Sequence, residues 1–469
     1  MAAMGINLAL GVLYSWSVIK KAIPAEWGWT DADKALPFSI ACIVFALVMV
    51  PAGRLQDRIG PRWLATAGGI LTGIGCIVAS FATSVSMYVL GFGVLAGIGI
   101  GLGYASATPP AVKWFSAKKT GMIAGIVVAG FGLASVYISP LANYIAGNNP
   151  AGKPRAELAA LVAANDSAAA EFDKAVASAK ETRGDAGLSA AVKAAETKKV
   201  AAADALRKSK EENIHKILLY FGIGFLLLVT LLSQFLKVPE AGYVPAEVSA
   251  TGAGAAAAVA KAAVNVPPSQ MLKTPLFYFL WIMFAFASGA GLMVIANLST
   301  IAKLGKVEAG FALVALLAIG NASGRVIAGM LSDKIGRLWT MFIVFTFQAA
   351  LMMVFRTGLT DIVAFVAISM LIGFNYGACL SLFPSATKDY FGLKNFGVTY
   401  GLVFTSWGVG GFLFPYVAGK IFEVAKTASA TGEGNYNQAF LVSAIALTTA
   451  ALLTFATRIA EKSFKEKQA

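Results

Sequence analysis

The run Gly53-Arg-Leu-Gln-Asp57-Arg-Ile-Gly60 recurs as Gly329-Met-Leu-Ser-Asp333-Lys-Ile-Gly336, 276 residues further along the chain. The same offset relates four more pairs: Phe115 to Phe391, Gly121 to Gly397, Gly125 to Gly401 and Gly132 to Gly408. A single register held over several segments indicates that the second half of the chain is a parallel copy of the first. Duplicated halves of this kind are typical of proteins that rock two bundles about a central site in a membrane, which favours a transporter over a receptor.

The composition places both copies in a lipid bilayer. Hydrophobic residues make up 58% of the 469 residues, charged residues only 13%, and the mean hydropathy is +0.72. Soluble domains carry roughly 25% charged residues, so an ordinary soluble enzyme is excluded. The formal charge of +14 comes from short basic clusters between apolar runs. Such clusters orient spans across a membrane, so the positive charge does not indicate nucleic acid binding, and we expect no nucleic acid partner.

Apolar runs long enough to cross a membrane recur along the whole chain. A spanning helix needs about 20 such residues. Candidate spans lie near 3–20, 35–52, 63–82, 86–108, 121–144 and 216–236, and then near 275–300, 309–331, 339–356, 361–385, 397–419 and 438–457. The sequence therefore predicts an all-α membrane protein with twelve transmembrane helices in two six-helix bundles related as parallel repeats. Its expected parts are a bundle at 1–236 with an insert at 147–214, a linker at 237–272, a bundle at 273–460 and a tail at 461–469.

Basic loops predict the orientation. Lys and Arg gather at 54–62, 113–119, 333–337 and 388–394 and in the tail after residue 458. By the positive-inside rule, these segments and both termini are expected to lie in the cytoplasm. The expected location of the protein is the inner membrane of the cell. Lys20 and Lys21 end the first span on the outer side, where we expect them to snorkel, with attraction of incoming anions as the alternative. No small-residue cleavage site precedes them, so the first span is expected to be retained.

The insert is rich in alanine and nearly neutral. Residues 151–214 contain 11 Lys and Arg against 10 Asp and Glu. This composition favours helix, and the break at Arg183-Gly-Asp-Ala-Gly187 predicts a helical hairpin that projects outward and takes no part in transport.

The repeated loop resembles the signature loop of the major facilitator superfamily, which implies that fold and alternating access. In it, Asp57 and Asp333 can accept from a helix N-terminus while Arg58, Lys334 and Arg337 hold a cytoplasmic gate through charge-assisted hydrogen bonds. Three further runs, which start at Pro109, Asn321 and Phe391, resemble the oxalate/formate antiporter family, relatives of the monocarboxylate transporters. That resemblance covers all twelve spans but not the insert, and it implies exchange or symport of small carboxylates.

Arg325 is the leading candidate for binding substrate. It lies eight residues before Asp333, so a helical rise of 1.5 Å per residue puts it roughly 12 Å inside the cytoplasmic edge, near mid-membrane. A cation at that depth usually binds an anion or a partner, and the spans offer it no Asp or Glu at the same depth. The equivalent position in the first copy is Met49, so the fold itself does not require an arginine there.

Five more residues are expected beside Arg325. Counted in the same way, Tyr104, Tyr376 and Phe404 reach a similar depth. The resemblance implies that positions matching Arg325, Tyr376 and Phe404 line the central cavity, and Asn321, one turn before Arg325, faces the same way. Trp407 stands where oxalate-specific members carry a second cation, which favours monocarboxylates such as lactate, pyruvate or formate.

The sequence is compatible with both proton symport and anion exchange. The related monocarboxylate transporters place a protonatable Asp where this chain has Asn321, so a proton would need another route. The same features also fit an oxalate/formate-type antiporter, a sugar or drug carrier of the same superfamily, and a membrane sensor whose hairpin detects a ligand. We expect no enzyme activity, cofactor or metal, because no nucleophile with its base and no metal-ligand spacing is present. We expect a monomer.

Overall fold

The computed structural model describes residues 1–112, 114–115, 120–149, 153–181, 186–240, 243, 265–307, 310–392 and 395–466. In the first half the helical elements are α1 (Ala2–Leu10), η1 (Gly11–Ser15), α2 (Trp16–Ile19), η2 (Lys20–Ala22), η3 (Ala25–Trp27), α3 (Asp31–Ile59), α4 (Pro61–Ser80), α5 (Val85–Tyr88), η4 (Val89–Ala96), α6 (Gly97–Val112), α7 (Thr120–Ile145), α8 (Ala156–Glu181) and α9 (Ala186–Ser233). In the second half they are α12 (Pro268–Met271), α13 (Pro275–Leu304), α14 (Gly310–Ile335), α15 (Arg337–Arg356), α16 (Ile362–Phe391), α17 (Phe396–Ala428) and α18 (Asn437–Glu466).

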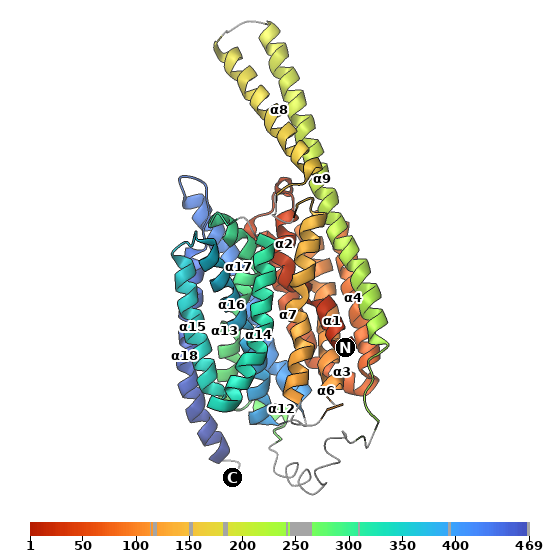
Figure 1. Cartoon of the computed structure of the whole chain (residues 1–469), viewed down its shortest axis with the longest axis vertical. Helices are drawn as coiled ribbons and strands as arrows, with labels where there is room; N and C mark the ends of the chain where they lie inside the picture. The colour runs from red at the N-terminus through yellow and green to blue at the C-terminus, as the bar shows by residue number, and fades with distance from the viewer. Residues whose placement is uncertain are drawn as a thin grey trace.

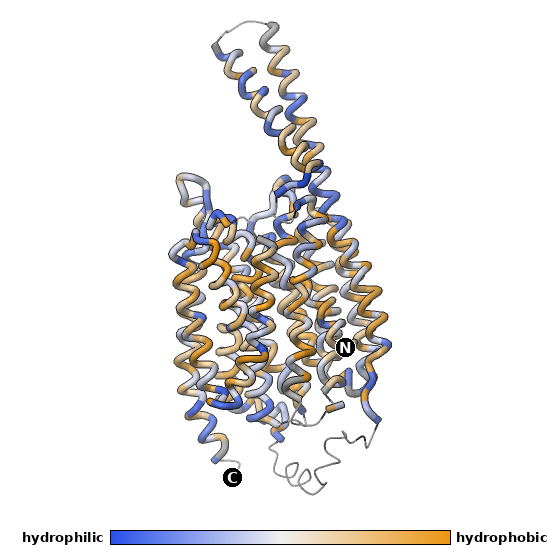
Figure 2. The backbone as a smooth tube through the Cα atoms, viewed as in Figure 1, coloured by the Kyte–Doolittle hydropathy of each residue, from blue (hydrophilic) through white to orange (hydrophobic). Residues whose placement is uncertain are grey.

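Twelve helical segments of the described chain are long and apolar enough to cross a membrane, and they divide evenly between the two halves. They stand side by side in one bundle, and apolar residues dominate its middle (Figure 2). The predicted all-α fold with twelve spans is confirmed. Residues 241–242 and 244–264 of the predicted linker and 467–469 of the predicted tail lie outside the described residues, as do 113, 116–119, 393 and 394 in two of the basic loops.

Glycine closes both copies of the repeated loop. A single residue separates α3 from α4, and another separates α14 from α15. These residues are Gly60 and Gly336, with φ angles of 85° and 91°. A residue with a Cβ rarely takes such angles, so the last glycine of the repeated run is needed for the turn.

The two halves meet along α3 and α17 and along α7 and α14. On the first pair, a Cβ added at Gly53 would lie only 3.0 Å from the carbonyl oxygen of Gly397, so the two backbones are in direct contact. Towards the opposite end of the pair, the amide of Asp31 donates to the carboxylate of Glu423 at 3.0 Å. The two halves are therefore in contact near both ends of this helix pair.

A helical hairpin projects from one end of the bundle (Figure 1). It consists of α8 and the first part of α9. The helix α9 has 48 residues in all, and its last part forms the sixth span, so this helix begins well before the 216–236 expected from hydropathy. Its base is attached to the first half: Trp27 Nε1 donates to Glu211 Oε1 at 2.9 Å, and Lys210 pairs with Glu26 at 3.8 Å. We call this side the hairpin end, and the side that carries Gly60 and Gly336 the loop end.

Two spans are not uniform α-helices. The first changes from α1 to the 3₁₀ turn η1 and then to α2 and η2, and the fourth contains the π-helical segment η4. A 3₁₀ turn has 3.0 residues per turn instead of 3.6, so the faces of the first span do not follow an α-helical count.

Candidate functional site

Arg325 lies on α14, between the two halves of the protein, with 3% of its surface exposed. Its Nε donates to Asn321 Oδ1 at 3.1 Å, and its Nη1 donates to the carbonyl oxygen of Val128 on α7 in the other half. Its Nη2 makes no hydrogen bond within the described residues, and no ion pair to a carboxylate is found for it there. A buried cation without a counter-charge costs several kcal/mol, so this arrangement is suited to an anion.

A second free donor lies beside it. Asn321 is fully buried, and its Nδ2 also has no hydrogen-bond partner in the part of the chain that the structure describes. Gly132 of α7 faces both groups: a Cβ added there would lie 3.4 Å from Arg325 Cζ and Nη2 and 3.5 Å from Asn321 Cγ. Two adjacent N–H donors can bind the two oxygens of a carboxylate, as an arginine fork does.

Hydrogen-bonded aromatic side chains lie beside this pair, since Tyr14, Tyr104 and Tyr376 all interact electrostatically with Arg325. Trp407 Nε1 donates to Tyr376 Oη at 2.8 Å, and the phenols of Tyr376 and Tyr14 lie 2.8 Å apart. The ring of Tyr14 packs edge-on against Phe131 at a centroid distance of 5.2 Å. These side chains, here called the central wall, thus join α17 and α16 of the second half to η1 and α7 of the first.

Further rings complete the enclosure. Phe404 stacks on Trp407 at 4.9 Å and contacts Phe45 at 5.3 Å and Tyr104 at 6.1 Å. Tyr104 also packs against Phe131 at 5.3 Å. Such rings exclude water and lower the local dielectric constant, which strengthens any contact between the guanidinium and an anion.

The structure brings all six predicted binding residues together, namely Tyr104, Asn321, Arg325, Tyr376, Phe404 and Trp407. Sequence reasoning missed other contributors, among them Tyr14, Phe45, Phe131 and the carbonyl of Val128. The repeat contained a signal for two of them, because Phe45 and Phe131 lie 276 residues before Asn321 and Trp407.

The predicted gate residues of the second copy lie at the loop end. Arg337 pairs with Asp333 at 2.6 Å and with Asp389 at 2.9 Å, and it also donates to Ser332 Oγ. Lys334 is exposed. Arginine therefore ties the turn between α14 and α15 to the end of α16.

In the first copy the gate is described only in part. Arg58 is exposed, and the side chain of Asp57 lies outside the described residues.

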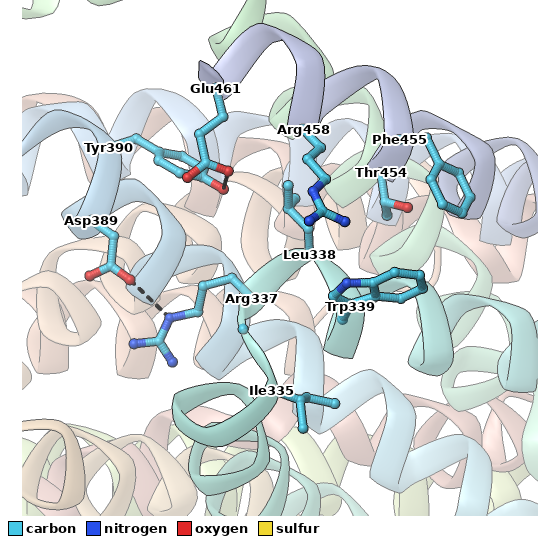
Figure 3. A pocket seen from close by; sticks show the side chains of 11 residues that line it. Ile335, Arg337, Leu338, Trp339, Asp389, Tyr390, Thr454, Phe455, Arg458 and Glu461 are labelled. Atoms are coloured by element: carbon cyan, nitrogen blue, oxygen red, sulfur yellow. Dashed lines mark hydrogen bonds and ion pairs between the residues drawn. The ribbon is translucent and has the colours of Figure 1, made fainter. Parts of the chain in front are cut away.

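A cavity of about 410 Å³ opens beside Arg337 (Figure 3). Asp389, Tyr390, Arg458 and Trp339 are among the residues that line it, and they come from α15, α16 and α18. None of the central residues around Arg325 lines this cavity, so it belongs to the loop end and not to the central cluster.

The expectation that Lys20 snorkels to the surface is wrong. Lys20 is only 3% exposed, because η2 turns it towards α13, where its Nζ donates to Asn297 Oδ1 at 2.5 Å. Lys21 is exposed, as expected.

The sequence profile of the Major Facilitator Superfamily matches residues 1–415 and 276–469. The chain belongs to the major facilitator superfamily. It is 25% identical to the oxalate:formate antiporter of Oxalobacter formigenes over 461 residues, which covers 97% of this chain and 90% of that protein. It is also 25% identical over 408 residues to YhjX, an uncharacterized transporter of this superfamily from Escherichia coli, which covers 86% of this chain and 83% of that protein. It is 22% identical over 436 residues to monocarboxylate transporter 14 of Mus musculus, which covers 90% of this chain and 82% of that protein.

Solved structures show the same fold. The nucleoside transporter NupG superposes with a TM-score of 0.59 at 12% identity, covering 97% of this chain and 98% of that one. An inward-facing bacterial homologue of the lysosomal transporter Spinster gives 0.55 at 15% identity, covering 99% and 98%. The family match and the curated relatives, together with the twelve apolar helices, make the protein a multi-pass membrane transporter of this superfamily and not an enzyme. This favours transport over a role as a membrane sensor.

Proposed function

We propose that the protein is a secondary active transporter of small carboxylates that works by alternating access. One observation carries the proposal: Arg325 Nη2 and Asn321 Nδ2 are buried and without a hydrogen-bond partner among the described residues, and the two side chains lie together beside Gly132. Unpaired buried donors cost free energy unless a ligand satisfies them. A carboxylate group supplies both the missing charge and two acceptor oxygens.

Similarity supports this substrate class. Relatives covering most of the chain include an oxalate:formate antiporter and monocarboxylate transporters. In this proposal the loop end and both termini lie on the cytoplasmic side, in accord with the basic loops, and the protein works as a monomer in the inner membrane.

Monocarboxylates are the favoured substrates. The central cluster, as far as it is described, holds one cation, Arg325, and Trp407 fills the position where a second cation would be expected for a dianion. A dianion would leave one buried charge uncompensated at a cost of several kcal/mol. Lactate, pyruvate and formate need only one cation, whereas an oxalate/formate antiporter must also accommodate the dianion.

Coupling in this proposal is either proton symport or anion exchange. Asn321 carries no titratable proton, so symport would move the proton with the substrate or through water next to Arg325. Uptake driven by an inward proton gradient into vesicles that contain no anion would reject obligatory exchange.

The test is uptake of labelled lactate, pyruvate, formate and oxalate by the purified protein in vesicles. The parent is expected to transport the monocarboxylates, and Arg325→Gln to lose uptake by about a thousandfold or more. Arg325→Lys should recover little, because lysine lacks the planar two-donor fork. Arg356→Gln, at the end of α15, is the control. Transport of a sugar or an uncharged drug, with carboxylates ignored, would instead favour the other carriers of the superfamily.

A further inference from the structure

Lys20 joins the two halves of the protein at the hairpin end. It belongs to η2 of the first half, and its Nζ donates to Asn297 Oδ1 on α13 of the second half. Asn297 Oδ1 also accepts from Tyr436 Oη at 3.1 Å, while Asn297 Nδ2 donates to the carbonyl of Met293 at 2.8 Å. Within the part of the chain that the structure describes, the buried ammonium is therefore held across the interface by one neutral amide oxygen.

No ion pair balances the buried charge of Lys20 within the described residues. Asp31 is the charged group that acts on it most strongly and attracts it from beyond ion-pair distance, while Lys34 and Lys21 repel it. Lys21 in turn is repelled by Lys303 of the second half. An amide dipole compensates a buried cation less well than an anion does, so this closed arrangement leaves unused affinity for an anion.

Opening of the hairpin end has to break this contact. Lys20 and Asn297 lie on opposite halves, and so do Ser17 and Ser299, whose hydroxyls are 3.4 Å apart. When α2 moves away from α13, the ammonium loses its amide partner and faces the opened passage. Lys20 follows Tyr14 of the central wall by six residues, or roughly 9–12 Å of helix. An anion bound to Lys20 would therefore lie about that far from the central cluster.

We propose that Lys20 is the cation of a second carboxylate-binding site at the hairpin end. The site forms when the halves separate there, and when they close Asn297 takes the place of the carboxylate beside Lys20. The inference rests on the proposed function. An entering carboxylate first binds the Lys20 ammonium, and Asn297 Oδ1 then displaces it towards Arg325 as the gate closes. Lys20 thus acts in capture from one side, whereas Arg325 acts in both directions.

Removal of the charge tests the site. Lys20→Gln keeps an N–H donor for Asn297 but has no charge, and Lys21→Gln is the matched control on the exposed neighbour. In vesicles with the hairpin outward, Lys20→Gln should raise the KM for carboxylate uptake by about tenfold or more with little change in kcat, and Lys20→Arg should restore it. Lys21→Gln should change the KM by less than about twofold, since Lys21 is exposed and is not the residue that donates to Asn297.

Chemical rescue separates charge from packing. Lys20→Cys is treated from the hairpin side with 2-aminoethyl methanethiosulfonate, which returns an ammonium, or with the 2-sulfonatoethyl reagent, which adds an anion. The first should lower the KM towards that of the parent and the second should raise it further. The native Cys42, Cys76 and Cys379 are buried, so the parent protein is the control for reaction elsewhere.

The outcomes distinguish this inference from the proposed function. An unchanged KM in Lys20→Gln, or equal effects of the two reagents, would overturn the Lys20 site while Arg325 could still bind substrate. Failure of the parent to transport any carboxylate would overturn both. If Lys20→Gln fails to fold, the KM values of Lys20→Cys after treatment with each of the two reagents decide whether the charge at this position matters.

Discussion

Phe131 and Trp407 occupy equivalent positions in the two copies of the repeat, and both face the ring of Phe45, at centroid distances of 5.9 and 5.1 Å. The indole of Trp407 also donates to Tyr376 at 2.8 Å, which the ring of Phe131 cannot do. The second copy therefore has the bulkier side chain, fixed in place by a hydrogen bond, on the side of the cluster that carries Arg325.

Trp407 is expected to limit substrate length to acids of about two to four carbons, because a large rigid ring leaves little room beside the arginine fork. Trp407→Leu should raise kcat/KM for hexanoate relative to lactate by about tenfold, the order of effect that one or two methylenes have in a pocket. Competition between the two acids in vesicles measures the ratio. Trp339→Leu, at an exposed position on α15, should leave the ratio unchanged.

Gly132 is expected to keep open the space beside the free donors. Gly132→Ala places its Cβ in ordinary contact, 3.4 Å from Arg325 Nη2, and should have little effect on transport. Gly132→Val adds two methyl groups towards the donors and should raise the KM by about tenfold or more. Gly125, on the same helix, has no atom within 4 Å of an added Cβ, so Gly125→Val is the control. Equal KM values for the two valine variants would contradict the assigned position of the ligand.

Gly53 is expected to permit closure at the loop end. A side chain there would collide with Gly397 of the other half, so Gly53→Val should destabilise the closed state by about 1–3 kcal/mol and shift the population towards a state open at this end. Spin labels at Arg54→Cys and Asn395→Cys would report a longer distance by pulsed EPR. Gly329→Val tests the equivalent position of the second copy, where the nearest atom is 3.9 Å away, and it should leave this distance unchanged.

Arg337 is expected to stabilise the loop end through its two carboxylate partners. Its side chain is 20% exposed, so Arg337→Gln leaves Asp333 and Asp389 unpaired and should cost about 1–2 kcal/mol, less at high salt. Lys334→Gln, next in the loop, should change stability by less than about 0.5 kcal/mol. Thermal unfolding in detergent compares the two variants, and a larger effect for Lys334 would contradict this assignment.

The sequence contains enough to predict the spans and much of the central cluster, because both depend on one-dimensional quantities. Hydropathy locates the spans, and the distance of a residue from a charged loop gives its depth. Among the residues at the depth of Arg325, the resemblance to carboxylate transporters is what singles out Tyr376 and Phe404. The rotation of a helix about its axis is not given by such a count. Tyr14 escapes prediction for this reason, since it lies in a 3₁₀ turn that an α-helical count misplaces.

Contacts between the halves are harder to predict. Lys20 has the sequence context of a surface lysine, beside Lys21 and at the end of a span, and only its pairing with Asn297 buries it. The two residues are 277 positions apart and are not related by the repeat, so neither local pattern nor internal symmetry predicts the contact. Phe45 and Phe131, by contrast, can be found through the repeat.

The hairpin of α8 and α9 is expected to be dispensable for transport. It has no counterpart in the second copy, and none of its residues lies in the central cluster. Replacing residues 151–210 with a short Gly and Ser linker keeps Glu211, and with it the contact to Trp27 that holds the base of α9 against the first half. Uptake by this variant in vesicles should stay within a few-fold of the parent, because the sixth span and all binding residues are retained.

The matched variant Trp27→Phe, which keeps the hairpin but removes the indole donor, shows what loss of the base contact alone does. If the shortened protein folds and inserts but does not transport, while Trp27→Phe does, the hairpin itself controls access at that end.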